Sequence, residues 1–123
     1  MGNLTTVEIK AFVPAKDFAR SKAFYQALGM RMASDSDGVA YFHHGNTSFL
    51  LQDYYVAELA DNLMMHLLVE DVEAWWQQVL TSNVAEDFGV RLVPPQDQPW
   101  GMRDFVVIDP SGVLWRSVAR SGQ

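Results

Sequence analysis

The sequence contains no cysteine, which excludes disulfide bonds, thiolate nucleophiles and Cys-ligated zinc. It has no apolar run approaching the length of a membrane span, and no charged start followed by the apolar stretch of a secretory signal. Basic residues are few: the chain has 9 Lys and Arg and 15 Asp and Glu, which gives a formal charge of −6. Binding to nucleic acid phosphates requires clustered Lys and Arg. We therefore expect a cytoplasmic protein with neither a membrane partner nor a nucleic-acid partner.

The apolar content is high enough for a folded core. Of the 123 residues, 49% are hydrophobic and 12% are aromatic, which predicts one domain spanning residues 1–123. No Ser-His-Asp or Cys-His arrangement and no glycine-rich phosphate loop is recognisable.

The first half of the chain has the pattern of one strand, one helix and three further strands. Alternation over residues 7–13 predicts a half-buried strand that ends at Pro14. Asp17 and Gly29 have the chemistry of helix caps and predict a helix that runs to about Leu28. Turn residues then separate three predicted strands, at about 31–34, 39–44 and 48–53.

The second half repeats this order after a predicted connector at residues 54–62. A strand is expected at 64–69, followed by a helix that is capped by Asp71 and has apolar residues at helical spacing. A polar loop with three prolines precedes the last expected strands, near 91–93, 104–108 and 113–119. The order βαβββ therefore occurs twice, in a first module of about residues 5–54 and a second of about 63–119. Such a repeat is stronger evidence for the fold than any single motif.

Several short segments resemble one known family by their order and spacing. They are Val13-Pro14-Ala15-Lys16-Asp17, Val69-Glu70-Asp71-Val72, and the stretch from Pro99-Trp100-Gly101 through Arg103-Asp104-Phe105 to Asp109-Pro110-Ser111-Gly112. The chain resembles the vicinal-oxygen-chelate superfamily of glyoxalases, dioxygenases and bleomycin-resistance proteins, and the last stretch looks most like the bleomycin-resistance branch. The resemblance implies an α+β fold in which two βαβββ modules form a curved, cup-like mixed sheet or barrel. It also implies helices on the convex face, a small ligand in the concave face, and a homodimer.

The resemblance further implies where a divalent metal would be held in enzymes of this superfamily. The four ligand positions fall on Lys10, Leu50, Met64 and Arg116. Leucine has no donor atom, and arginine keeps its proton. We therefore expect no metal and no cofactor. The alternative is a displaced metal two residues away along the strands, where the same face is presented, at Glu8, Gln52 and His66.

Seven residues are candidates for ligand binding: Glu8, Lys10, Gln52, His66, Trp100, Arg103 and Arg116. His66 is either a hydrogen-bonding group or base in the pocket, or a polar residue on an open wet surface. Arg116 either meets an acidic group of the ligand or belongs to a structural cluster, in which Glu8 pairs with it or with Lys10. An exposed aromatic and a guanidinium near the start of a strand can stack on a planar ligand. Trp100 and Arg103 are predicted to do so, unless Trp100 only packs its loop.

The sequence thus favours a protein that binds a small organic molecule, an antibiotic or a metabolite, without making or breaking bonds. The ligand would sit in the concave face or in a groove between two copies. The alternative is an enzyme of the glyoxalase lyase or dioxygenase type with a displaced metal. A third option is a metal-independent isomerase or lyase with His66 as the base.

Overall fold

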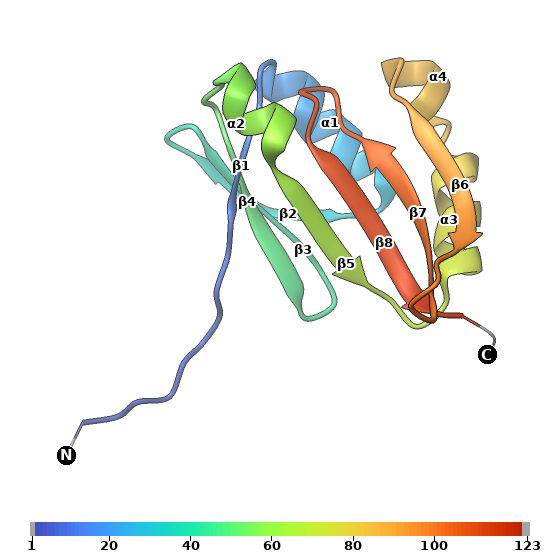
Figure 1. Ribbon diagram of the computed structural model, residues 1–123. Coiled ribbons are helices and arrows are strands. Elements are labelled where there is room, and N and C mark those ends of the chain that lie inside the picture. The colour runs from blue at the N-terminus through green and yellow to red at the C-terminus, as the bar shows by residue number, and fades with distance from the viewer. Residues whose placement is uncertain (1, 122–123) are drawn as a thin grey trace.

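Two four-stranded sheets form the frame of the structure, a computed structural model that describes residues 2–121 (Figure 1). Sheet A has the order β1-β4-β3-β2, from β1 (Phe12–Pro14), β2 (Arg31–Ser36), β3 (Val39–His44) and β4 (Thr47–Gln52). Sheet B has the order β5-β8-β7-β6, from β5 (Met64–Leu68), β6 (Leu92–Asp97), β7 (Met102–Ile108) and β8 (Leu114–Arg120). In each sheet the first strand runs parallel to the last, and the other pairs are antiparallel. The predicted repeat of βαβββ is confirmed, but the two sheets do not close into a barrel.

The two long helices begin where their caps predict, and the first also ends at its predicted cap, Gly29. In α1 (Phe18–Leu28) the carboxylate of Asp17 accepts a hydrogen bond from the Arg20 amide at 3.1 Å. In α3 (Val72–Ser82) Asp71 accepts one from the Ala74 amide at 3.0 Å. These bonds satisfy amides that the first turn of a helix leaves unpaired. Two short helices, α2 (Ala57–Asn62) and α4 (Val84–Phe88), were not predicted, so the predicted connector 54–62 is in part helical.

The predicted strand at residues 7–13 is wrong over most of its length, because β1 covers only Phe12–Pro14. The preceding residues form an N-terminal arm, defined here as residues 2–11. The side chains of Val7 and Ile9 on this arm are 94% and 96% exposed. Alternation alone does not make a strand where no neighbouring surface buries its apolar side.

The prolines were wrongly expected to lie outside the strands. Pro14 lies inside β1, and Pro94 and Pro95 lie inside β6. Both are edge strands, where a missing N–H is tolerated.

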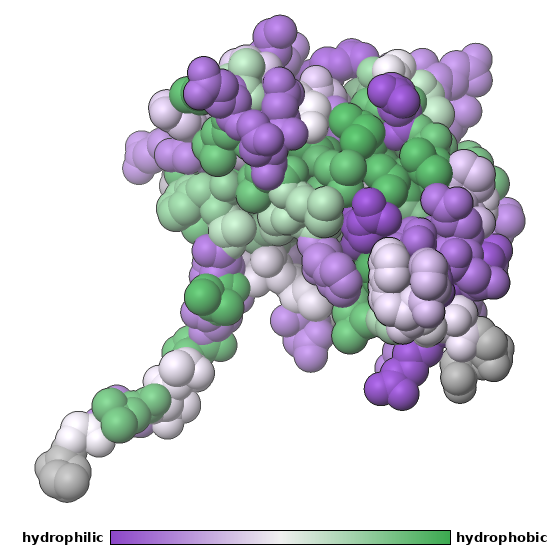
Figure 2. Space-filling model, in the orientation of Figure 1, coloured by the Kyte–Doolittle hydropathy of each residue, from purple (hydrophilic) through white to green (hydrophobic). Residues whose placement is uncertain are grey.

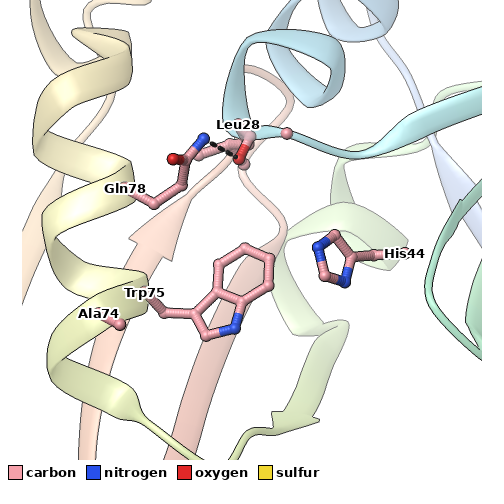
Figure 3. Close-up of a pocket in the computed structure, with 6 residues that line it drawn as sticks. Leu28, His44, Ala74, Trp75 and Gln78 are labelled. Atoms are coloured by element: carbon pink, nitrogen blue, oxygen red, sulfur yellow. Dashed lines mark hydrogen bonds between the residues drawn. The ribbon is translucent and has the colours of Figure 1, made fainter.

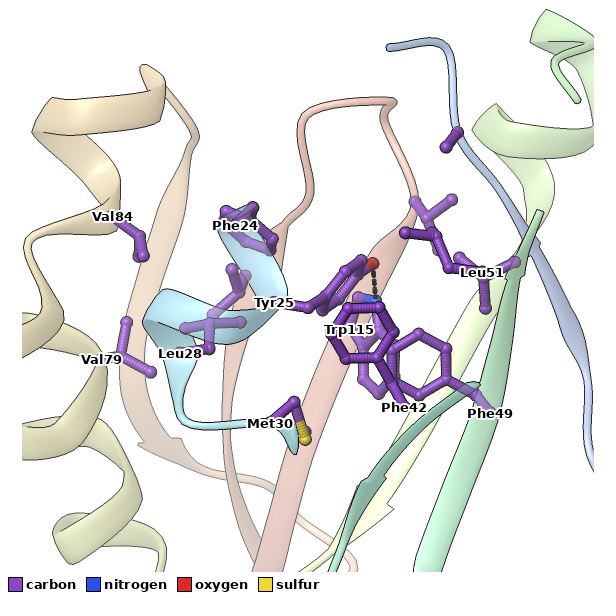
Figure 4. Packing of buried hydrophobic residues seen from close by; sticks show 14 of the residues in the cluster. Phe24, Tyr25, Leu28, Met30, Phe42, Phe49, Leu51, Val79, Val84 and Trp115 are labelled. Atoms are coloured by element: carbon purple, nitrogen blue, oxygen red, sulfur yellow. Dashed lines mark hydrogen bonds between the residues drawn. The ribbon is translucent and has the colours of Figure 1, made fainter. Parts of the chain in front are cut away.

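A single cluster of buried side chains joins the two modules (Figure 4). Tyr25 of α1 packs against Phe49 of sheet A and Trp115 of sheet B, with ring centroids 4.9 and 5.6 Å apart. Its hydroxyl donates a hydrogen bond to Asp109 and accepts one from the Trp115 indole at 2.8 Å. Burial raises the pKa of Tyr25 well above its usual value, and burial also raises the pKa of Asp109 against the opposing hydrogen bonds from Tyr25 and backbone amides. The helices and sheets are thus fixed to one another at the centre.

Asp109 also builds the turn between β7 and β8. Its carboxylate accepts hydrogen bonds from the amides of Ser111 and Val113, at 2.8 and 2.9 Å. The Gly112 amide closes the turn on the Asp109 carbonyl at 3.0 Å. The sequence Asp-Pro-Ser-Gly therefore forms the turn that its residue chemistry predicts. Among residues 2–121, no helix has the length and hydropathy needed to cross a membrane.

Candidate ligand-binding site

The side of sheet B that faces away from α1 and α3 is partly uncovered, and we call it the open face (Figure 1). Alternate residues of β5 point to it, and Met64 and Leu68 are 54% and 64% exposed there. Figure 2 shows apolar side chains gathered over this side of the molecule, with polar ones among them. An exposed apolar surface of this kind is typical of a binding site. This is the side opposite the helices, where the family resemblance predicts the ligand.

A line of polar side chains crosses the open face from strand to strand. His66 of β5 lies beside Arg116 of β8 in the parallel register. The Arg116 guanidinium lies 3.3 Å from the carboxylate of Asp104 on β7, which is 2% exposed. Asp104 also accepts a hydrogen bond of 3.1 Å from the side-chain amide of Gln98. The ion pair with Asp104 restrains the Arg116 guanidinium, and the Arg116 side chain stays 29% exposed.

His66 also lines a hollow of about 290 Å³ between β5 and the hairpin of β3 and β4. The polar lining on the hairpin side includes His43 and Ser48. Aromatic and apolar side chains complete the walls, among them Phe49, Leu67 and Trp115. A mostly apolar hollow with a few converging polar groups is the usual form of a small-molecule site.

Glu8 fastens the N-terminal arm to sheet A. Its carboxylate lies 2.5 Å from the Lys10 ammonium and accepts hydrogen bonds from the hydroxyls of Ser48 and Tyr41, at 2.6 and 2.9 Å. The bonds with Lys10, Ser48 and Tyr41, in that order of size, lower the pKa of Glu8 to about 2. Of the two pairings predicted for Glu8, the structure therefore has the one with Lys10, while Arg116 pairs with Asp104.

Trp100 and Arg103 point to different surroundings. Trp100 is 68% exposed in the turn before β7, where the amide of Gly101 bonds to the carbonyl of Gln98. The Arg103 guanidinium instead binds Glu73 of α3 at 2.6 Å and Asp97 of β6 at 3.4 Å. Arg103 thus ties sheet B to α3. The prediction that both residues contact a ligand remains a prediction.

The residues at the expected metal positions do not fit a divalent metal. Lys10 is paired with Glu8, Leu50 and Met64 offer no oxygen or nitrogen donor, and Arg116 stays protonated. The displaced set is dispersed: Glu8 and His66 line different hollows that share Ser48, and Gln52 lines neither. In the described range 2–121, no group of three His, Cys, Asp or Glu side chains could hold a metal.

Sequence reasoning did not identify the partners of the predicted residues. Asp104 and Gln98 position Arg116, and Tyr41 and Ser48 hold Glu8. A carboxylate directly before the apolar run 105–108 was the available signal for Asp104, because a charge in a buried strand needs a partner. The partners of Glu8 had no such signal, since they follow from the path of the arm.

Comparison with known families and structures identifies the relatives of this architecture. The sequence matches the model of the Glyoxalase/Bleomycin resistance protein/Dioxygenase superfamily over residues 8–116. The chain belongs to this superfamily. The resemblance predicted from the sequence motifs is thereby confirmed. No curated protein matches the sequence.

Several solved structures share the fold. A bleomycin-binding protein complexed with bleomycin matches with a TM-score of 0.79 and 22% identity, over 94% of this chain and all of that one. TnmS3, an antibiotic-binding protein from Streptomyces sp. CB03234, matches with a TM-score of 0.72 and 23% identity, over 97% of this chain and all of that one. A lactoylglutathione lyase from Agrobacterium tumefaciens matches with a TM-score of 0.65 and 16% identity, over 94% of this chain and 95% of that one. At these identities the matches establish the glyoxalase fold, which both binding proteins and a lyase use.

Proposed function

We propose that this superfamily member binds a small organic molecule, an antibiotic or a metabolite, on the open face of sheet B, and that it does so without chemistry. The observation that carries the proposal is the combination of exposed Met64 and Leu68 with the oriented pair of Arg116 and Asp104. Apolar contact supplies affinity, and a guanidinium held by a buried carboxylate supplies orientation. The bleomycin-binding and antibiotic-binding neighbours support this class of ligand.

Isothermal titration with bleomycin and a panel of planar aromatic metabolites tests the proposal. We expect heat of binding with at least one of these probes. Met64→Gln should weaken that binding about tenfold, since it loses apolar contact on the open face. Leu80→Gln is the matched control, because Leu80 is 46% exposed but lies on α3. An absence of heat with every probe contradicts the proposal, as does equal weakening by both variants.

We further propose that two copies associate and that the ligand groove lies between them. Leu4, Val7 and Ile9 on the arm are each more than nine-tenths exposed, and Met64 and Leu68 add apolar surface on the open face. Exposed apolar side chains grouped on the arm and on the open face favour contact with a second copy. Light scattering after size exclusion should give twice the chain mass of 13.9 kDa. Val7→Asp with Ile9→Asp should give a monomer, whereas Leu80→Asp should not; a wild-type monomer contradicts this part.

The enzyme alternative has a separate test. It requires a metal at Glu8, Gln52 and His66, or His66 acting as a base. Elemental analysis after dialysis against nickel, zinc, manganese and iron measures the first directly. We expect less than about a tenth of an equivalent, given the donor sets described above. Binding near one equivalent that is lost in His66→Ala would favour the lyase or dioxygenase alternative, as would turnover lost in that variant.

A further inference from the structure

A second cleft lies between α3 and the turn that joins β3 to β4, next to the hollow that His66 lines. A hollow of about 360 Å³ opens beside Leu28, Gly29 and Gln78, and another of about 390 Å³ opens beside Glu70 and Asp71. The two share His44, Ala74 and Trp75 in their linings. We call the pair the hairpin cleft. Volumes of this size match those of small-molecule sites.

One face of α3 forms the long wall of this cleft. Asp71, Ala74, Trp75 and Gln78 are spaced three and four residues apart, so they lie on one side of the helix. Figure 3 shows Trp75 and Gln78 on the side of α3 that faces Leu28 and His44. The exposed Ala74 leaves room, because its side chain is only a methyl group between larger neighbours. Trp75 is only half-buried and lines the cleft.

The middle of the cleft is aromatic. The rings of Trp75 and His44 stand 4.8 Å apart at 67°, an edge-to-face arrangement. Beside them the Gln78 side-chain N–H donates a hydrogen bond to the Leu28 carbonyl at 3.1 Å. This bond fixes the orientation of the amide and leaves its oxygen available to accept a hydrogen bond. A flat organic body therefore finds an aromatic wall and a hydrogen-bond acceptor.

The charge at one end of the cleft is negative. Asp71 is engaged as the cap of α3, but Glu70 has no ion pair or side-chain hydrogen bond among residues 2–121. Neither hollow has a Lys or Arg in its lining. Glu70 and Trp75 line the same hollow. A carboxylate attracts a cation through its opposite charge, and an indole attracts one through its π face. The total charge of −6 acts in the same direction.

We propose that the hairpin cleft is a second ligand site, next to the open face, that takes an organic cation: an ammonium attached to a flat aromatic body. The aromatic body lies against Trp75 and His44, and the ammonium lies towards Glu70. The hairpin cleft borders the open face, because Leu68 lines the hollow beside Glu70 and also the hollow beside His66. His66, Met64 and Arg116 line neither hollow of the cleft, so a test at Glu70, Ala74 and Trp75 is separate from the test of the open face.

Three indole probes that differ in charge test this directly: tryptamine as the cation, tryptophol as the neutral analogue and indole-3-acetate as the anion. Binding is followed by the indole N–H resonance of Trp75 in the intact ¹⁵N-labelled protein, assigned by its absence in Trp75→Phe. We expect tryptamine to bind about fivefold more tightly than tryptophol, and indole-3-acetate to bind most weakly. Equal binding of the three, or no shift of Trp75 with any, overturns the proposal.

Variants separate charge from shape. Glu70→Gln should abolish the preference for tryptamine over tryptophol, whereas Glu86→Gln, an equal charge change on α4 that lines neither hollow, should keep it. Ala74→Leu should block all three probes by filling the cleft, with an unchanged unfolding midpoint, because Ala74 is exposed and leucine is a good helix former. Retained binding in Ala74→Leu overturns the proposal. Failure of the open-face proposal would leave these results unaffected, since none of the variants lies on that face.

Discussion

At the scale of single residues, the most connected polar group is the buried hydroxyl of Tyr25. It joins Asp109 in the turn of module two, Trp115 in sheet B and its own helix in module one. Buried polar groups that satisfy one another fix a specific arrangement, but they become costly when one partner is removed. The network therefore holds the two modules in register with each other.

We predict that Tyr25→Phe destabilises the fold by about 1–3 kcal/mol. The aromatic packing stays, but the Trp115 N–H loses its acceptor and Asp109 loses a donor. Urea unfolding followed by circular dichroism measures this. Tyr54→Phe is the control, since Tyr54 is 51% exposed, and it should be close to neutral. Equal small effects of the two substitutions would contradict a stabilising role for the network.

At the scale of elements, both ends of α1 and the start of α3 were predictable from the sequence, whereas the extents of β1 and β6 were not. Asp17, Asp71 and Gly29 act locally, so their chemistry predicts the helix ends without knowledge of the fold. The extent of β1 depends on what lies beside it, and no neighbouring surface buries the side chains of Val7 and Ile9. The same difference between local and long-range signals explains which residues of the site could be predicted. His66 and Arg116 are found from the repeat, but Asp104 and Gln98 become their neighbours only through the strand order.

The end of α1 offers a test at this scale. Gly29 has φ 107° and lies so close to α3 that a Cβ would come within 3.0 Å of the Gln78 amide nitrogen. Gly89, at the end of α4, has φ 64° and open space around it. Gly29→Ala should therefore cost more than Gly89→Ala, which should cost about 1–2 kcal/mol for the left-handed backbone alone. Thermal unfolding of the two variants compares them; equal losses would mean that the contact with Gln78 is unimportant.

The N-terminal arm gives a prediction for pH. The pKa of Glu8 is about 2 when its carboxylate is bound to Lys10, Ser48 and Tyr41, and 4.5 is its ordinary value. Because the bound pKa is the lower one, docking of the arm is fully favoured above about pH 4.5 and is lost as the pH falls towards 2. The Leu50 amide, which donates to the Ala11 carbonyl at 3.0 Å, should report this by its NMR shift.

In Glu8→Gln the Leu50 resonance should be displaced already at neutral pH and should lose its acid titration. A Leu50 resonance that titrates identically in the variant would show that other groups control the arm.

At the scale of the whole molecule, the two modules share one core and turn the uncovered side of sheet B outward. The fold is that of the glyoxalase superfamily, but the residues at the expected metal positions are a lysine, a leucine, a methionine and an arginine. The repeat and its motifs were sufficient to predict the family and the βαβββ topology. They were not sufficient to predict that the sheets stay open, because closure depends on how the two sheets pack.

The most direct test of the central claim is an amide NMR titration of the intact protein with bleomycin, mapped onto the structure. The account predicts shifts concentrated on β5 and β8, at His66, Leu68 and Arg116, which saturate with added ligand and are reduced in Met64→Gln. Shifts that are confined to other parts of the molecule, or an unchanged spectrum at millimolar bleomycin and with every planar aromatic probe, would contradict a ligand site on the open face.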